Sequence, residues 1–432
     1  MRNNIVYVGA HELRYEIREI VEIGNNLRDM GLDICWENIG DPVHKGEKVP
    51  SWIKEIIKDA VDKDSSFAYC PTKGLDETRE FLANICNKGK KTQITKEDII
   101  FFNGIGDAIS KIYNYLRKEA RVIGPSPAYS THSSGEAAHA GEDPLMYKLD
   151  PNNNWFPDLK CLRNKINNNQ AISGILVINP NNPTGTVYPG DVMKEIVRIA
   201  EEYDLFIICD EIYLNITYNG IVSTPLSDVI NSVCGISMKG ISKELPWPGA
   251  RCGWIEIYNK DKDPVFKEYI NTVLNAKMLE VCSTTLPQQI IPNLLYSPEY
   301  KEHHIERNER YERRSRFAYD TFKRIDGIIV NQTNGAFYMT VAFKDGVLND
   351  KQKLEISNKT IRNYIEEITR DVELDKRFVY YLLGVTGICV VPLTGFSCEL
   401  YGFRITLLET NYEKYEWIIK TVAGKIREYL NS

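Results

Sequence analysis

The chain has 432 residues and a net charge of −6, from 59 acidic against 53 basic residues. Its length predicts two or three domains, and its 43% of hydrophobic residues is typical of a globular protein. The acidic balance disfavours nucleic acids and anionic membranes as partners, because both bind basic surfaces. No apolar run reaches the roughly 20 residues that span a membrane, and the ten cysteines form no CxxC pair. We therefore expect a cytoplasmic protein with neither a zinc site nor a disulfide scaffold.

Short apolar runs alternate with amphipathic helical patterns from about residue 99. We expect strands at 99–102, 121–124, 174–179, 205–213, 235–238 and 251–258, and helices at 107–118 and 188–204. The continuously apolar runs GILVIN and LFIIC are typical of strands that are covered on both faces. The alternation predicts βαβ units and a large, doubly wound, mostly parallel sheet.

The last third of the chain has a different pattern. Long helical stretches over 262–320 precede a hairpin around Asn334-Gly335, a helix near 354–370 and a terminal helix near 411–430. This pattern predicts a smaller α+β domain. The charged stretch 301–316 within it is interpreted as a solvated helix face and is given no role.

We predict three segments in the α/β chain. Residues 1–48 form an N-terminal segment that joins the small domain, residues 49–290 form the large cofactor-binding domain, and residues 291–432 form the small C-terminal domain.

Polar residues follow the predicted strands at the points where they end. Asn103-Gly104, the loop NPNNPTG (179–185) and Asp210 of DEIY each close a strand. Each has a plain structural alternative, a turn for NPNNPTG and a helix N-cap for Asp210. Doubly wound sheets bind ligands beyond the carboxyl ends of their strands. These positions therefore predict one shared site.

The stretch SMKGISKELPWPGARCGW (237–254) carries the remaining groups that such a site needs. A lysine in a partly dry pocket, such as Lys243, loses its proton more easily and forms a Schiff base with a carbonyl. Arg251 is a planar cation suited to phosphate. Together with Asp210, these two residues can hold a phosphorylated pyridine aldehyde by its aldehyde, its ring nitrogen and its phosphate.

The combination NPNNPTG, DEIY, Ser242-Lys243 and PGAR resembles the class I/II, fold-type I, pyridoxal-phosphate-dependent aminotransferases, with ordered matches from about residue 38 to 408. The resemblance implies an aspartate-aminotransferase-like fold and pyridoxal 5'-phosphate as the cofactor. It implies that Lys243 forms the Schiff base and that Asp210 pairs with the ring nitrogen. Tyr213 and Asn182 would then bond the phenolic oxygen of the ring, while Arg251 holds the phosphate.

The resemblance extends to further cofactor contacts. By resemblance, the amides of Ile105 and Gly106 open a helix whose N-terminus attracts the phosphate, and Ser242 is a further cofactor-binding residue. Tyr129 of PSPAY matches the aromatic residue that stacks on the cofactor. Tyr69 of FAYCPTKG matches a tyrosine that reaches the phosphate of the neighbouring subunit, which implies a homodimer with composite sites.

The expected reaction moves the amino group of an α-amino acid to a 2-oxo acid, with the Lys243 amine moving the Cα proton. By resemblance, Arg404 of YGFRITLLE pairs with the substrate α-carboxylate. Gly40 of NIGDP and Asn182 lie against the substrate. No second arginine is assigned to a distal carboxylate, so the sequence does not identify the amino acid.

The chain departs from many relatives at Gly240, where they carry a serine or threonine that bonds the phosphate. The hydroxyl contact is either missing or supplied by Ser237, Ser242 or Lys239. We interpret Lys239 itself as an ordinary turn residue.

Other functions remain as alternatives. A carbon–sulfur β-lyase on the same fold often has histidine at the position of Tyr213, and a decarboxylase or cyclopropane-forming synthase differs only in substrate orientation. A non-catalytic binding protein conflicts with the intact set of Lys243, Asp210 and Arg251. The lone GxGxxA at 103–109 lacks the acidic residue of a dinucleotide site, and the adjacent His303-His304 do not share a helix face as metal ligands would.

Overall fold

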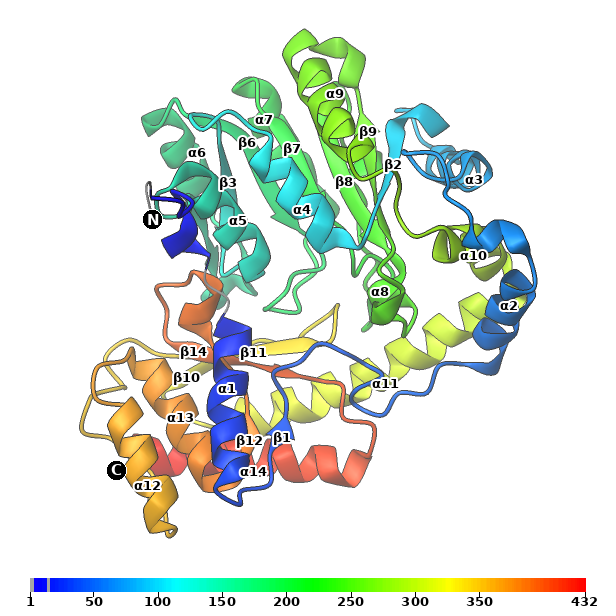
Figure 1. Ribbon diagram of the computed structural model, residues 1–432. Coiled ribbons are helices and arrows are strands. Elements are labelled where there is room, and N and C mark those ends of the chain that lie inside the picture. The colour runs from blue at the N-terminus through cyan, green and yellow to red at the C-terminus, as the bar shows by residue number, and fades with distance from the viewer. Residues whose placement is uncertain (1–3, 14–15) are drawn as a thin grey trace.

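The computed structural model describes residues 4–13 and 16–432. The upper body in Figure 1 is built on an eight-stranded sheet with the order β2-β9-β8-β7-β6-β3-β4-β5. The central strands β8, β7, β6, β3 and β4 are parallel, whereas β9 is antiparallel to both β8 and β2, and β5 to β4. The predicted mostly parallel sheet is confirmed. Its strands are β2 (Ile99–Phe102), β3 (Arg121–Ser126), β4 (Met146–Asp150), β5 (Phe156–Pro157), β6 (Ile172–Ile178), β7 (Phe206–Asp210), β8 (Gly235–Gly240) and β9 (Gly253–Tyr258).

Helices cover both faces of this sheet, which explains its continuously apolar strands. Successive side chains of a strand point to opposite faces. Ile175 and Val177 of β6 therefore share one core with the helices α6 and α7, while Leu176 and Ile178 share the opposite core with α4 and α9. The covering helices are α4 (Ile105–Asn114), α5 (Ser130–Ala140), α6 (Leu159–Asn168), α7 (Gly190–Glu202) and α9 (Pro264–Met278).

The lower body in Figure 1 contains a four-stranded antiparallel sheet with the order β10-β11-β14-β13. Strands β10 and β11 form the predicted hairpin around Asn334-Gly335. The strand β1 (Cys35–Trp36) pairs in parallel with β12 (Ile388–Cys389). The boundaries at residues 48 and 290 stay a prediction. The other elements are α1 (Glu16–Asp29), β10 (Ile328–Val330), β11 (Tyr338–Phe343), α12 (Lys359–Ile368), α13 (Leu374–Thr386), β13 (Val391–Pro392), β14 (Gly402–Thr406) and α14 (Tyr412–Leu430).

The long helix α11 (Pro298–Phe322) runs from beside α10 (Thr285–Tyr296) to the lower body (Figure 1). Its charged sequence led us to expect a solvated face, which is wrong. Arg307, Tyr311 and Arg314 are buried on it, because the helix lies between the bodies and its cations meet acceptors that are distant in sequence. α10 packs on α2 (Ser51–Val61) and α3 (Asp76–Asn87). No helix in the described part of the chain is long and apolar enough to cross a bilayer.

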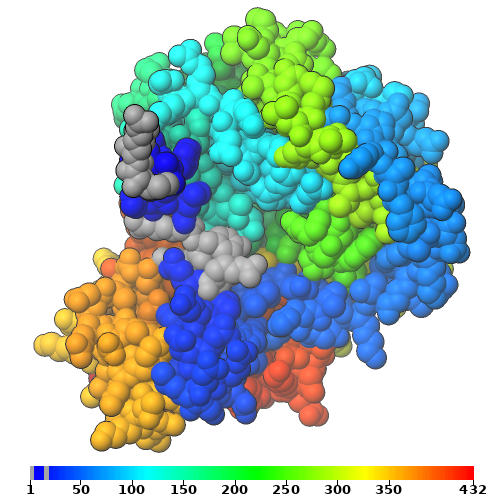
Figure 2. All heavy atoms as spheres, in the orientation of Figure 1, coloured from blue at the N-terminus to red at the C-terminus, as the bar shows by residue number. Residues whose placement is uncertain are grey.

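Residues 37–47, which we call the strap, connect the lower body to α2. In Figure 2 the blue chain that leads from α1 toward α2 lies along the boundary between the upper body and the orange and red lower body. The strap thus lies where parts of both bodies meet.

Candidate active site

A cavity of about 620 Å³ lies at the carboxyl ends of β6, β7 and β8, and residues of both bodies line it. Another hollow of about 670 Å³ lies elsewhere on the upper body, so size alone does not identify the site. What distinguishes the first cavity is the convergence of charged and polar groups. The predicted site residues that line it are Gly40, Ile105, Gly106, Tyr129, Asn182, Asp210, Tyr213, Ser242, Lys243, Arg251 and Arg404.

Lys243 lies in the short helix α8 (Ile241–Glu244), directly after β8. Its Nζ donates to the carbonyl oxygen of Gly40 in the strap at 2.6 Å. Burial lowers the pKa of Lys243 to about 8; the positive charges of Arg404 and Arg251 act in the same direction, against Asp41 and Asp210. The neutral amine is therefore accessible near neutral pH.

Asp210 is the last residue of β7 and is 3% exposed. Its Oδ1 accepts from the backbone N–H of Ile212 at 3.1 Å, and its Oδ2 lies 3.0 Å from Nε2 of His132 in α5. The other ring nitrogen of His132, Nδ1, lies 3.5 Å from the hydroxyl of Tyr113. Sequence reasoning missed His132, because a histidine inside a helix carries no local signal of its partner.

Tyr213 and Tyr338 bring their hydroxyls together at 3.0 Å, from the upper and the lower body. Burial, followed by the neighbouring Tyr338, raises the pKa of Tyr213 well above 10, so its phenol stays protonated. Tyr338 was also missed. It explains why position 40 is glycine, since a Cβ there would lie 2.0 Å from the Tyr338 hydroxyl oxygen. Tyr129 lies at the N-terminus of α5, and its ring forms a T-shaped pair with that of His132, with 6.4 Å between the ring centroids.

Two arginines, the buried Arg404 and the exposed Arg251, face the cavity, and neither has a carboxylate partner among the described side chains. Arg404 of β14 is 1% exposed, and its guanidinium donates to Asn182 Oδ1 at 3.2 Å and to the carbonyl of Asn38. Arg251 donates to the carbonyls of Pro248 at 3.1 Å and Asn103 at 3.4 Å. Among the residues that the structure describes, no carboxylate forms an ion pair with either arginine. A cation without a counterion next to a cavity is the arrangement that binds an anionic ligand.

The N-terminus of α4 forms a cradle beside Arg251. The helix begins at Ile105 after Gly104, whose φ of 87° is in the left-handed region. A Cβ at Gly104 would lie 2.4 Å from Nη2 of Arg251, whereas a Cβ at Gly106 would meet no atom within 4 Å and would project into open space. The first N–H groups of a helix have no internal partner and attract anions. A phosphate fits this cradle, an aldehyde fits the Lys243 amine, and a ring nitrogen fits Asp210. These residues therefore suit pyridoxal 5'-phosphate.

The structure shows where the three residues proposed to replace the hydroxyl at Gly240 lie. Ser237 donates to Glu211 Oε2 at 2.5 Å, and Lys239 donates to Glu256 Oε2 at 2.8 Å, so both are occupied elsewhere. Ser242 lines the cavity. A side chain at Gly240 would bring its Cβ to 2.9 Å from the Cys252 carbonyl oxygen.

Our interpretation of Lys239 as a turn residue is wrong. It belongs to β8, and its ammonium group completes a buried cluster with Glu211 and Glu256. Local sequence did not reveal this because Glu256 faces it from the neighbouring strand β9.

Tyr69 lies outside the cavity and is 84% exposed. Since its predicted role is in the site of a neighbouring subunit, that role stays a prediction.

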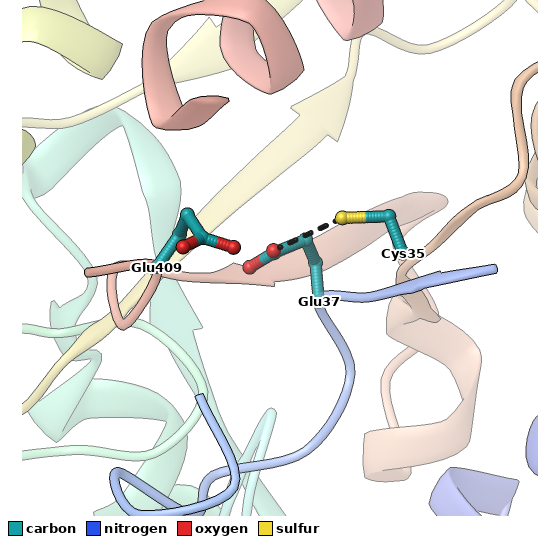
Figure 3. Close-up of side chains that lie close together, drawn as sticks. All are labelled: Cys35, Glu37 and Glu409. Carbon is teal, nitrogen blue, oxygen red and sulfur yellow. Dashed lines mark hydrogen bonds between the residues drawn. The ribbon is translucent and has the colours of Figure 1, made fainter. Parts of the chain in front are cut away.

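Cys35, Glu37 and Glu409 form a second cluster of chemically active side chains (Figure 3). Their potential ligand atoms lie within 4.8 Å of one another, but the Nζ of Lys45 is 2.5 Å from Glu37 Oε1 and 3.5 Å from Glu409 Oε2. Burial and the nearby Glu37 raise the pKa of Cys35 to about 12, so it remains a thiol. The ammonium group thus takes the place that a metal ion would need. The cluster joins the strap to the chain after β14.

Residues 36–420 match the family described as aminotransferase class I and II. The chain belongs to this family and is an aminotransferase. It is 59% identical over its whole length to an uncharacterized aminotransferase from Methanocaldococcus jannaschii, all of which it covers. It is 30% identical over 346 residues to the glutamate-pyruvate aminotransferase AlaA of Escherichia coli, covering 79% of this chain and 83% of that protein.

The fold agrees with a solved relative. The alanine aminotransferase from Pyrococcus furiosus superposes with a TM-score of 0.82 at 25% identity, covering 98% of each chain. This confirms the fold-type I architecture. Nothing in these comparisons favours the lyase alternative.

Proposed function

We propose that this aminotransferase binds pyridoxal 5'-phosphate in the cavity at the ends of β6–β8 and uses Lys243 to move the amino group of an α-amino acid to a 2-oxo acid. One observation carries the proposal. A lysine whose pKa is about 8 shares this cavity with a buried carboxylate and with two arginines that have no carboxylate partner in the described part of the chain. An enzyme that holds an aldehyde, a ring nitrogen, a phosphate and a substrate carboxylate needs this set of groups.

Each proposed cofactor contact follows from the chemistry of the side chain. Asp210, held by His132, keeps a proton on the ring nitrogen, and Arg251 with the first amides of α4 binds the phosphate. Tyr213 and Asn182 donate to the phenolic oxygen, and Tyr129 covers the ring. When bound, the cofactor supplies an aldehyde for the amino group and a protonated ring that accepts the electron pair of the Cα carbanion.

Lys243 carries the proton in the proposed reaction. In the protein without cofactor, burial lowers the pKa of Lys243 to about 8, toward the neutral amine that can accept the proton from the substrate Cα. The hydrogen bond from Lys243 Nζ to the Gly40 carbonyl fixes the position of this amine. Arg404 holds the α-carboxylate with its planar guanidinium, so that Cα faces Lys243.

We propose glutamate and pyruvate as the first substrates to test. The support is the 30% identity to a glutamate-pyruvate aminotransferase. The purified protein is supplied with pyridoxal 5'-phosphate and a panel of amino acids paired with 2-oxo acids, and both products are quantified by chromatography. We expect stoichiometric formation of a new amino acid and a new oxo acid. Release of ammonia or thiol without a new amino acid would contradict the proposal.

We further propose a homodimer in which Tyr69 contributes to the partner's phosphate site. Its support is the family resemblance and the exposure of Tyr69 and Phe67, which are 84% and 71% exposed. Mixing a Tyr69→Ala subunit with a Lys243→Ala subunit provides a test, because a hybrid dimer then has one site with both native residues. We expect activity to reappear on mixing. Two subunits that stay inactive together, or a protein that sediments as a monomer, would reject composite sites.

We also propose a cytoplasmic location. All ten cysteines are free thiols, which suits a reducing compartment. Fractionation of the source cells with an antibody against the chain tests this, and recovery from the membrane or the medium would contradict it.

A further inference from the structure

Arg307 of α11 reaches the backbone of the lysine that we propose as the reacting amine. It is 1% exposed, and its Nη1 donates to the carbonyl oxygens of Lys243 at 3.0 Å and Glu244 at 2.6 Å. These are the last carbonyls of α8, a helix of 4 residues. The terminal carbonyls of a helix lack internal partners. Arg307 therefore satisfies them and fixes the main chain of Lys243; Figure 1 shows α8 above α11.

The same guanidinium holds one end of the strap. Its Nε donates to Glu47 Oε1 at 2.7 Å, its Nη2 approaches Oε2 at 3.3 Å, and Arg310 adds a bond to Oε1 at 2.9 Å. Burial acts to raise the pKa of Glu47, but Arg307 and Arg310 lower it below its ordinary 4.5. Glu47 is therefore ionised at neutral pH, and the contact is a buried, charge-assisted fork.

The other end of the strap is held independently. Within the strap, Lys45 pairs with Glu37 at 2.5 Å. Lys45 also pairs with Glu409, which joins the strap to the lower body. Between the two ends, the carbonyl of Gly40 accepts the bond from the Lys243 amine. Arg307 thus holds the main chain of Lys243 directly. It also anchors the strap, whose Gly40 carbonyl holds the amine of Lys243.

We propose that Arg307 and Glu47 are positioning residues for amino transfer: they fix the strap relative to the main chain of Lys243, so that its amine faces the substrate Cα. This inference rests on the proposed role of Lys243. Misplacing a reacting group by about 1 Å costs on the order of 100-fold in rate. Fixing Lys243 both at its main chain and at its amine is therefore expected to raise kcat.

Arg314 offers a matched control. It lies two turns further along α11, is 4% exposed, and its Nη1 also donates to a backbone carbonyl, that of Leu407, at 3.0 Å. It makes no contact with Lys243 or the strap among the hydrogen bonds of the described residues. Replacing it tests what a buried arginine of this helix contributes to the fold alone.

The first measurement compares kcat and KM of the cofactor-loaded variants. Arg307→Lys keeps the charge but cannot bond both carbonyls and Glu47 together, and we expect kcat to fall about 10- to 100-fold. Glu47→Gln keeps the contacts of Arg307 to Lys243, and we expect a fall of about 3- to 10-fold. KM should change less than about threefold in both, and Arg314→Lys should keep kcat within about twofold.

The second measurement uses the protein without cofactor. Competitive acetylation with acetic anhydride across pH, read by peptide mass spectrometry, reports the neutral fraction of each lysine. In the wild type we expect the Lys243 midpoint near pH 8, following its lowered pKa. In Arg307→Lys and Glu47→Gln it should rise by about one unit or more, because a displaced strap admits water. Arg314→Lys should leave it unchanged.

Two results would overturn the inference. One is a pair of folded Arg307→Lys and Glu47→Gln proteins with wild-type kcat and an unshifted Lys243 midpoint. The other is an equal loss of kcat in Arg314→Lys, which would reduce Arg307 to a stabilising residue. If Arg307→Lys does not fold, Glu47→Gln decides alone. Lys243→Ala separates the two proposals: an active Lys243→Ala protein rejects the role of Lys243, while an inactive one beside normal Arg307 and Glu47 variants rejects only this inference.

Discussion

Lys239 and Lys243 are four residues apart, yet their surroundings have opposite electrostatic effects. Burial acts to lower the pKa of Lys239, but the carboxylates of Glu256 and Glu211 raise it above its ordinary 10.5. Burial lowers the pKa of Lys243 to about 8, and among the described residues its amine donates only to the carbonyl of Gly40. A buried charge with matched partners is thus costly to remove, because its partners would be left uncompensated, whereas a buried charge without them remains available for a ligand.

Replacing Lys243 gives the largest expected effect on activity. Lys243→Ala should lower the rate of amino transfer by more than about 10³-fold, because the nucleophile and the proton carrier are lost together. Its thermal unfolding midpoint should be no lower than that of the wild type, since the variant no longer buries a cation without a carboxylate partner. Steady-state assays and calorimetry measure both. Retention of more than a few per cent of activity would show that the two lysines do not differ as described.

Replacing Lys239 should have the opposite outcome. Lys239→Met leaves the carboxylates of Glu211 and Glu256 buried without their cation, and we expect a loss of about 3–5 kcal/mol in the free energy of unfolding. Activity per folded molecule should stay within about threefold of the wild type. Urea denaturation followed by fluorescence measures the stability.

The control for this prediction is the double variant Lys239→Met/Glu256→Gln, which removes one of the stranded charges. It should recover part of the lost stability. A stable Lys239→Met protein with impaired turnover would instead assign Lys239 to the site.

Arg404 extends the comparison to an arginine without a carboxylate partner. Arg404→Lys should lower kcat/KM for amino acids by about 10- to 100-fold, because lysine cannot bind a carboxylate with a planar fork. Stability should change little, since none of the described carboxylates pairs with Arg404 and would be stranded. An amine substrate without an α-carboxylate provides the internal control, because its slow turnover should not change. An equal loss for both substrates would contradict a role in carboxylate binding.

The pH dependence tests the lowered pKa of Lys243 itself. The neutral amine attacks an aldehyde, so capture of pyridoxal 5'-phosphate by the cofactor-free protein should rise about tenfold per unit below pH 8 and level off above it. The same shift affects stability. Below about pH 8 Lys243 is protonated in both the folded and the unfolded protein, and the cost of burying its charge lowers the free energy of unfolding. Between about pH 8 and 10.5 only the unfolded lysine keeps its proton, so the free energy of unfolding rises with pH over that window. Lys243→Ala should lack both effects.

The sequence predicted the parts of the site that lie in local motifs. Asp210 and Asn182 follow continuously apolar strands, and such strands end at the edge where a doubly wound sheet binds its ligands. Lys243 and Arg251 are close enough in sequence to be recognised as a pair. The fold followed from the same alternation of strands and helices, with element ends displaced by a few residues.

The residues that were missed depend on contacts between distant elements. Tyr338 belongs to a strand of the lower body, and His132 to the first turn of the helix α5, so neither shows its partner in the surrounding sequence. Arg307 lies in a stretch of alternating charges that is typical of a solvated helix. Lys239 resembled a turn residue because Glu256, which neutralises it, lies on the next strand.

The most direct test of the account is to identify the lysine that reacts with the cofactor. The protein is incubated with pyridoxal 5'-phosphate and reduced with borohydride, and the modified peptide is located by mass spectrometry. We predict one modified residue per chain, Lys243, with Lys239 unmodified because its amine remains protonated between two carboxylates. Modification at Lys239, or modification spread over surface lysines with Lys243 intact, would contradict the assignment of this cavity as the active site.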